Sequence, residues 1–197
     1  MFHRPAFAEP DLDRIAALVA AHPFGLLVTG EGGLDASPVP FTVARQAEGL
    51  VLEGHLAAGN PQCARIGAGA PALAIFSGPH AYVSPSWYRT QPAVPTWDYA
   101  AVHVHGALEP VTDDGEMRAM LRALSAHDPA FTLEGLPADY LGGMMRGIRA
   151  FRIRAQRIEA QWKMSQNRSI ADREAVITAL REQGSHDVAA LIESTIG

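Results

Sequence analysis

Hydrophobic side chains recur along the chain at two periods, one typical of helices and one of strands. Residues 11–22 repeat them at helical spacing, with Asp11 as a capping residue and Pro23 as the stop. Residues 24–30 (FGLLVTG) predict a buried strand, whereas residues 49–56 alternate. The first third of the chain therefore predicts one amphipathic helix followed by strands.

Prolines indicate where further strands are expected to end. Residues 38–44 predict a strand whose two prolines favour an edge position or an entry point. A turn at Gly78-Pro79 is expected to separate strands at residues 71–78 and 80–84. The proline-rich segment 84–95 predicts no regular structure.

The second half of the chain alternates between strand and helix patterns. Residues 96–111 predict strand, and residues 112–127 predict an amphipathic helix with Thr112 as its cap. Residues 150–163 alternate, but the hydrophobic parity reverses near Gln156-Arg157, which predicts a β-bulge. Two helices, residues 169–184 and 185–196, are expected to meet at Gly184.

Many short strands with a few helices predict a mainly β fold of the α+β class: a small antiparallel barrel with peripheral and C-terminal helices. The repeated strand–helix alternation and glycine fingerprint of a dinucleotide-binding fold are absent.

Composition restricts the function. The 197-residue chain is 48% hydrophobic, which suits a folded domain, and its net charge of −5 argues against broad attraction to nucleic acid. Cys63 is the only cysteine, so intramolecular disulfides are excluded, and we expect it to be a small buried residue. We see no secretion signal and no apolar run of the roughly 20 residues that cross a bilayer. These features predict a cytoplasmic protein.

The first candidate for chemistry is the segment 54–62, in which a strand ends near His55 and a helix is expected to begin. Asn60 is placed as N-cap and Pro61 as the first helical residue. Free backbone N–H groups there favour an anion such as phosphate. The alternative is that His55 and Asn60 only terminate their elements.

The second candidate is the segment 78–88, where Trp87 and Tyr88 follow Ser84-Pro85-Ser86. Aromatic rings on a loop can stack on a planar ligand, and serine hydroxyls can bind its polar edge. The alternative is that both aromatic rings anchor the loop to the barrel.

His103 and His105 form a third candidate, because both rings leave the same face of a strand, within reach of one metal ion. His55 or His80 would then be the third ligand. We prefer the interpretation that alternating histidines bind their neighbours, and we assign no metal site. No G-x-S-x-G motif supports a hydrolase, and no residue is assigned a catalytic role.

Five segments resemble, in order, the PaiB-type FMN-binding negative transcriptional regulators: HPFGLLVT, GHLAAGNPQ, IFSGPHAYVSPSWY, VPTWDYAAVHVHG and KMSQNRSIADREAVI. The resemblance implies a split barrel of the pyridoxamine-oxidase-like flavin-binding kind. It also implies a homodimer with FMN at the subunit interface. We expect residues 1–165 to form the flavin-binding domain with its N-terminal helix. Residues 166–197 would be a helical extension packed on the barrel or on the dimer partner.

The same resemblance places a polar cluster at the edge of the cofactor or of the dimer interface: Lys163, Ser165, Gln166, Asn167 and Arg168. The two cations would face phosphate and the two amides the flavin rim. Alternatively, Asn167 and Arg168 connect the C-terminal helices to the barrel. The helix that follows is expected to begin with Ser169 as its cap, assisted by Asp172 in capping-box spacing.

Two positions depart from the family pattern. Ala58 stands where relatives often carry a basic residue, and Pro38 where we expect histidine or another polar residue. Losing a charge-assisted hydrogen bond weakens phosphate binding. We therefore expect FMN to bind weakly, or the site to be vacant or altered.

Three functions stay open on the sequence. The first is a dimeric FMN-binding regulator, the second a flavin-dependent oxidoreductase of the same fold, and the third a dimeric interaction protein without cofactor. Direct DNA contact through the last helix is not expected, because residues 185–197 contain no Lys or Arg.

Overall fold

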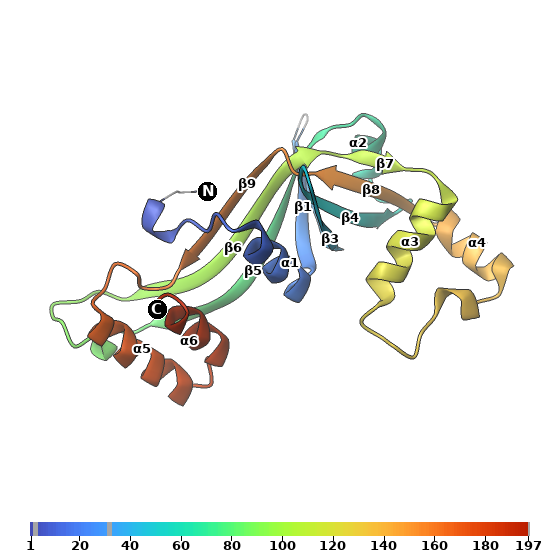
Figure 1. Cartoon of the computed structure of the whole chain (residues 1–197). Helices are drawn as coiled ribbons and strands as arrows, with labels where there is room; N and C mark the ends of the chain where they lie inside the picture. Colours follow the sequence, from blue (N-terminus) through green and yellow to red (C-terminus); the bar gives the residue numbers. More distant parts are fainter. Residues whose placement is uncertain (2–3, 31–32, 197) are drawn as a thin grey trace. The chain divides into compact units, whose positions relative to one another are not determined.

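The computed structural model describes residues 1, 4–30 and 33–196 and contains helices and strands in alternating blocks (Figure 1). The strands are β1 Phe24–Gly30, β2 Leu34–Pro40, β3 Thr42–Gln46, β4 Gly49–Ala57, β5 Pro71–Val83, β6 Thr96–Ala107, β7 Glu109–Val111, β8 Ile148–Arg154 and β9 Arg157–Lys163. The α-helices are α1 Leu12–Ala21, α2 Cys63–Gly67, α3 Asp114–Ser125, α4 Ala138–Arg146, α5 Ile170–Glu182 and α6 His186–Glu193. Short 3₁₀ turns lie at Pro5–Phe7, Pro85–Trp87 and Leu133–Gly135.

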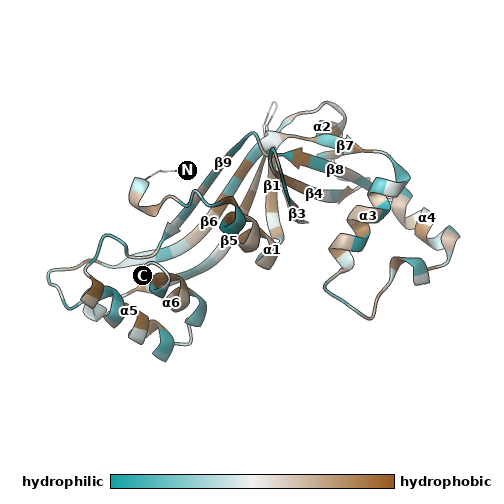
Figure 2. Ribbon diagram, in the orientation of Figure 1, coloured by the Kyte–Doolittle hydropathy of each residue, from teal (hydrophilic) through white to brown (hydrophobic). Residues whose placement is uncertain are grey.

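These strands form two sheets, one ordered β2-β1-β5-β6-β9 and the other β3-β4-β8-β7. The pairs β1–β2, β1–β5, β3–β4, β4–β8 and β7–β8 are antiparallel. Brown and teal alternate along the strands in Figure 2, as expected for strands with one buried face. The predicted α+β class is confirmed.

The chain divides into two compact units. We call residues 1–11, 77–102 and 159–197 the terminal unit, and residues 12–76 and 103–158 the central unit. Strands β5, β6 and β9 contribute residues to both units. The predicted domain boundary between residues 165 and 166 stays a prediction.

The central unit is built around aromatic and aliphatic side chains from β2–β5 and β8. Phe41 packs edge-on against Phe76 and Phe151, with ring centroids 5.2 and 6.0 Å apart. Leu27 on β1 and Leu52 on β4 are also fully buried in this unit. Such edge-to-face packing adds stability beyond the burial of apolar area.

The terminal unit buries the facing sides of α5 and α6. Val176 and Leu180 on α5 are fully buried, as are Ala189 and Ile192 on α6. The predicted junction at Gly184 is confirmed: its φ of +79° lies in the left-handed region that glycine adopts without steric penalty. The two C-terminal helices therefore form a packed pair (Figure 1).

The prediction that a turn at Gly78-Pro79 separates two strands is wrong. The chain passes through Gly78-Pro79 without a turn, and β5 is one strand. Strand β1 pairs with β5 only over Ala72–Ile75, so the missing N–H of Pro79 removes no hydrogen bond to β1. In contrast, β2 is an edge strand, as its prolines predicted, and a separate strand, β3, begins after Phe41.

The predicted bulge at Gln156-Arg157 is instead a change of sheet. Strand β8 ends at Arg154 in the four-stranded sheet, and β9 begins at Arg157 in the five-stranded sheet. The parity of the hydrophobic positions reverses because the two strands bury different faces. The sequence located the break correctly but not its nature.

Two local predictions also need correction. Helix α3 is capped by Asp113, whose carboxylate accepts a 2.9 Å hydrogen bond from Glu116 N, and not by Thr112. Cys63 is only half-buried, and its thiol donates to the carbonyl oxygen of Ala57 at 3.2 Å.

Candidate functional site

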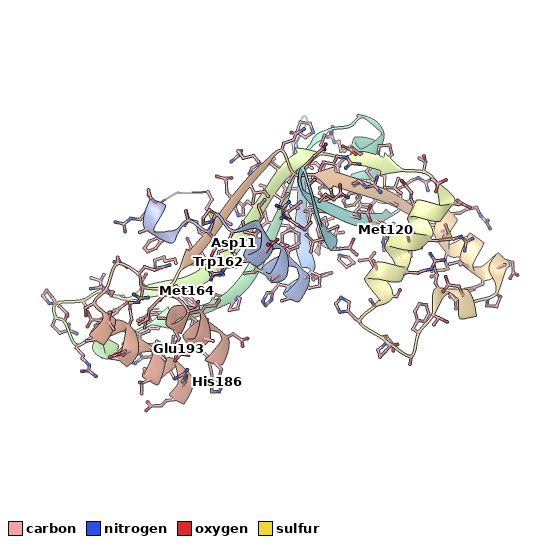
Figure 3. The ribbon with its side chains drawn as sticks, viewed as in Figure 1. Asp11, Met120, Trp162, Met164, His186 and Glu193 are labelled. Carbon is pink, nitrogen blue, oxygen red and sulfur yellow. The ribbon has the colours of Figure 1, made fainter. Side chains whose placement is uncertain are left out.

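The predicted polar cluster begins where β9 ends. Ser165 has a φ of +56°, which is unusual for a residue other than glycine, and its carbonyl oxygen accepts from Arg168 N at 2.9 Å. The Gln166 side chain closes the same turn: its Oε1 accepts from Met164 N at 2.7 Å and its Nε2 donates to Trp162 O at 2.5 Å. Trp162 and Met164 lie at the end of this strand (Figure 3). The amide of Gln166 therefore holds the turn together.

Asp98, on the first half of β6, is the centre of the cluster and is fully buried. Ser165 Oγ donates to its Oδ2 at 2.6 Å, and Lys163 Nζ lies 3.3 Å from its Oδ1. The same ammonium donates to Thr96 Oγ1 at 2.6 Å and to the carbonyl oxygen of Trp97. Because an ammonium has three N–H groups, all of them are used within the protein. Lys163 therefore connects β9 to β6 and has no N–H group left to bind a phosphate.

Burial raises the pKa of Asp98 above its ordinary value, while the Ser165 hydrogen bond and the positive charge of Lys163 oppose that rise. A buried carboxylate is tolerated only when it is paired and hydrogen-bonded. Both of its oxygens are bonded here, so the turn after β9 is attached firmly to β6.

Arg168 stacks on a ring of the aromatic loop. Its guanidinium carbon lies 4.2 Å from the centroid of Tyr88, whose side chain is buried. Among the residues that the structure describes, Arg168 forms no ion pair with an acidic side chain. A guanidinium held flat on an aromatic face keeps its N–H edge available for a ligand.

The aromatic loop itself is ordered by local hydrogen bonds. Ser84 Oγ accepts from Ser86 N at 3.3 Å and begins a 3₁₀ turn that contains the half-buried Trp87. Thr90 N donates to Asp172 Oδ1 at 2.9 Å, which ties the loop to α5 and lowers the pKa of Asp172. Ser169 caps α5 as predicted, but the carboxylate of Asp172 binds the loop and does not complete a capping box.

Two adjoining pockets open on this cluster. One of about 190 Å³ is lined by five of the predicted residues: Tyr88, Lys163, Ser165, Asn167 and Arg168. A second of about 350 Å³ shares Arg4, Phe7, Thr96 and Lys163 with the first. Ser84, Trp87 and Gln166 line neither pocket.

The sequence did not single out Arg4, Phe7, Thr96 and Asp98. Thr96 and Asp98 lie within the quoted VPTWDY segment, so a signal for them was present. Arg4 carried no such signal, because its place beside the cluster follows from the N-terminal segment pairing with β9. Ala8 forms a β-bridge with Gln161, and Glu9 N donates to Ala160 O at 3.0 Å.

His55 and Asn60 belong to the central unit, whereas the other predicted residues belong to the terminal unit. Asn60 Nδ2 donates to Ser37 Oγ at 3.0 Å and its Oδ1 accepts from Gln62 N at 2.9 Å. Helix α2 begins at Cys63 with Gln62 at its N-cap, so the prediction of Asn60 as N-cap and Pro61 as first helical residue is wrong. Burial lowers the pKa of His55, and its buried Nδ1 has no hydrogen-bond partner within the described residues. An unpartnered buried ring nitrogen is a position at which a ligand could bond.

The alternating histidines of β6 are both half-buried. His105 Nδ1 lies 3.0 Å from a guanidinium nitrogen of Arg157, consistent with histidines that bind their neighbours.

The fold places the chain in the class of α+β split-barrel proteins, as the resemblance predicted. The chain belongs to the family described as "Putative FMN-binding domain", whose model matches residues 1–157. That match includes His55, Asn60 and Tyr88 but ends before the turn after β9.

The chain is 34% identical over 182 residues to Protease synthase and sporulation protein PAI 2 of Bacillus subtilis, covering 90% of this chain and 87% of that protein. An uncharacterized protein of Emericella nidulans is 25% identical over 94% of this chain and 92% of its own length. The expected PaiB-type membership is thereby confirmed.

Solved structures support the fold. The FAD and heme binding protein of Mycobacterium smegmatis superposes with a TM-score of 0.58 at 18% identity, covering 85% of this chain and 78% of that one. The flavocytochrome of Azotobacter vinelandii gives 0.58 at 12% identity, covering 79% and 69%. Within the described residues, no helix is long and apolar enough to cross a membrane.

Proposed function

We propose that this chain binds FMN as a homodimer and acts as a negative regulator of gene expression. Membership of the FMN-binding family and 34% identity to a Bacillus subtilis protein named for protease synthesis and sporulation support the proposal. Bound FMN would supply reversible electron transfer, and the protein would position it.

The observation that carries the cofactor part of the proposal is Arg168. It lines the smaller pocket, stacks on buried Tyr88 at 4.2 Å, and has no acidic partner among the described residues. A charged hydrogen bond to phosphate is among the stronger polar contacts that a protein makes. Arg168 and Arg4 are the side chains that would hold the anionic part of FMN, and Tyr88 would support Arg168.

The donor set fits a flavin nucleotide in a second respect. Asn167 is exposed on the lining of the pocket, where its amide can face a polar ring edge.

The open side of these pockets supports a second copy of the chain. Sites for ligands of this size commonly enclose about 300–1,000 Å³. The pocket beside Arg168 holds about 190 Å³, and the adjoining one holds about 350 Å³ and is open. A partner subunit would complete the enclosure.

Titration of FMN into the purified protein, followed by flavin fluorescence, tests this site. Arg168→Ala should weaken FMN binding about tenfold or more, because it removes a charge-assisted hydrogen bond. Its melting temperature should fall by less than about 4 °C, since a cation–π contact contributes only about 0.5–1 kcal/mol. The control is Arg181→Ala, whose side chain pairs with Glu193 on the exposed helix surface.

Unchanged FMN affinity in Arg168→Ala together with a large loss of thermal stability would make the arginine structural. Absence of FMN binding by the wild-type protein would favour the dimeric interaction protein without cofactor.

The regulatory part of the proposal does not require a DNA-binding surface on the C-terminal helices. Arg181 pairs with Glu193 at 2.8 Å, and Arg173 is buried, so neither offers a free charge to phosphate. We expect regulation to proceed through the flavin or through a protein partner.

Transcript profiles of a deletion strain test this idea. Complementation with the wild-type gene should restore repression, whereas complementation with Arg168→Ala should not. Identical transcripts in the wild-type and deletion strains would contradict it.

A further inference from the structure

A third pocket lies in the central unit, whereas the two pockets beside Arg168 lie in the terminal unit. Its volume is about 550 Å³, within the range of roughly 300–1,000 Å³ that suits small organic ligands. Helices α2, α3 and α4 and strands β7 and β8 supply its walls. The helices α3 and α4 lie beyond the ends of these strands in Figure 1.

The floor of this pocket is apolar. Ile66, Val111 and Met145 contribute to it and are at most 7% exposed. Met117 also lines it and packs against the hydrophobic clusters of both Val111 and Met145. Methionine side chains adapt their shape to a ligand at low cost, so this floor suits a flexible hydrocarbon body.

The lining also carries three arginines: Arg118, Arg146 and Arg149. None of them forms an ion pair with an acidic side chain of a described residue, and Glu134, which feels the charge of Arg118, is hydrogen-bonded to Arg122. Arg149 Nη1 donates to the carbonyl oxygens of Ile148 and Arg146 at 2.8 and 3.2 Å, which holds its guanidinium in place. Asp114 is the one acidic residue on the lining.

Two adjacent glycines on α4 leave space for the guanidinium group of Arg146. Glycine is a poor helix former, and Gly142 and Gly143 stand together inside this helix. A Cβ on Gly142 would meet Arg146 Nη1 at 3.5 Å, and a Cβ on Gly143 would meet Nη2 at 3.8 Å. The guanidinium of Arg146 therefore lies close over the glycines, and Gly142 leaves space on the pocket wall.

We propose that this pocket binds an amphipathic organic anion, with a carboxylate held by the arginines and an alkyl body lying on the apolar floor. Guanidinium groups without an acidic partner, beside a preformed apolar cavity, suit such a ligand. The carboxylate can form charged hydrogen bonds with the arginines, and the alkyl chain can be buried against the apolar side chains. The site is separate from that proposed for FMN.

Calorimetric titration of the full-length protein with decanoate, and with decanol as the neutral match, tests the proposal. Decanoate should bind saturably, one molecule per chain, and decanol at least about tenfold more weakly, because it lacks the charge. Arg146→Gln should weaken decanoate by about the same factor. Arg154→Gln, outside the pocket on the same sheet and paired with Glu109, is its control.

Filling the pocket gives an independent test. Gly142→Leu places a side chain against the wall and should abolish decanoate binding without lowering the melting temperature, because leucine favours helix. Gly143→Leu is the matched control: it lies next in the helix, is exposed and lines no part of the pocket. FMN affinity should be unchanged in both variants.

Decanoate affinity equal to wild type in Gly142→Leu, or decanol binding as tight as decanoate, would overturn the proposal. Loss of FMN binding in Gly142→Leu but not in Arg168→Ala would overturn it too, because the pocket would then be the flavin site.

Discussion

At the scale of single residues, the clearest feature is the buried contact of Asp98 with Ser165 and Lys163. The polar cluster after β9 was predicted to face a ligand, but Lys163 and Gln166 use their donors on protein atoms. Arg168 is the member left without an acidic partner in the described chain. Its neighbours hold the turn that positions it.

The raised pKa of Asp98 gives a pH-dependent prediction. Its folded-state pKa lies above the ordinary 3.8. Between these two pKa values, Asp98 is protonated in the folded protein and ionised in the unfolded chain. The stability from this group is present below the ordinary pKa and is lost as the pH rises through the folded-state pKa.

Wild type should therefore lose stability relative to Asp98→Asn as the pH rises from about 3.5 to 7, because asparagine does not ionise. Urea unfolding of both proteins across this range measures the difference. The exposed Asp139→Asn variant is the control. A wild-type-to-variant difference that is constant with pH would contradict the assignment.

At the scale of elements, the start of α5 was more predictable than the connections between strands. A cap acts over three residues, so Ser169 was identified from the sequence, and its Oγ accepts from Asp172 N at 3.1 Å. Whether Pro79 ends a strand depends on which neighbour pairs there, and whether Gln156 marks a bulge depends on which sheet receives β9. Those partners are distant in sequence.

Ser169→Ala should lower the free energy of unfolding by about 0.5–2 kcal/mol, because α5 loses the hydrogen bond at its N-terminus. Ser185→Ala is the matched control, since Ser185 stands at the N-cap of α6 and makes no side-chain cap bond. Chemical denaturation measures both. An equal loss in the two variants would show that the Ser169 bond contributes little.

At the scale of the whole molecule, the proposed homodimer gives a direct measurement. Sedimentation should show a species of twice the 21.1-kDa chain, and FMN should shift the equilibrium toward it, because a ligand that binds only the dimer stabilises it by mass action. Arg181→Ala should behave as wild type. A monomer that binds FMN with full affinity would refute a site shared between subunits.

The sequence by itself determined the family, the α+β class, the cap of α5 and the segment that holds Arg168. These depend on local periodicity, on short-range hydrogen bonds and on motifs that stay together in the chain. Tertiary structure alone decided which donors remain available. Ser165 bonds Asp98 across 67 residues and Lys163 bonds Thr96 across 67 residues, so their engagement depends on strand pairing. It also decided that Arg118 and Arg146, from different helices, line one pocket, since only packing brings them together.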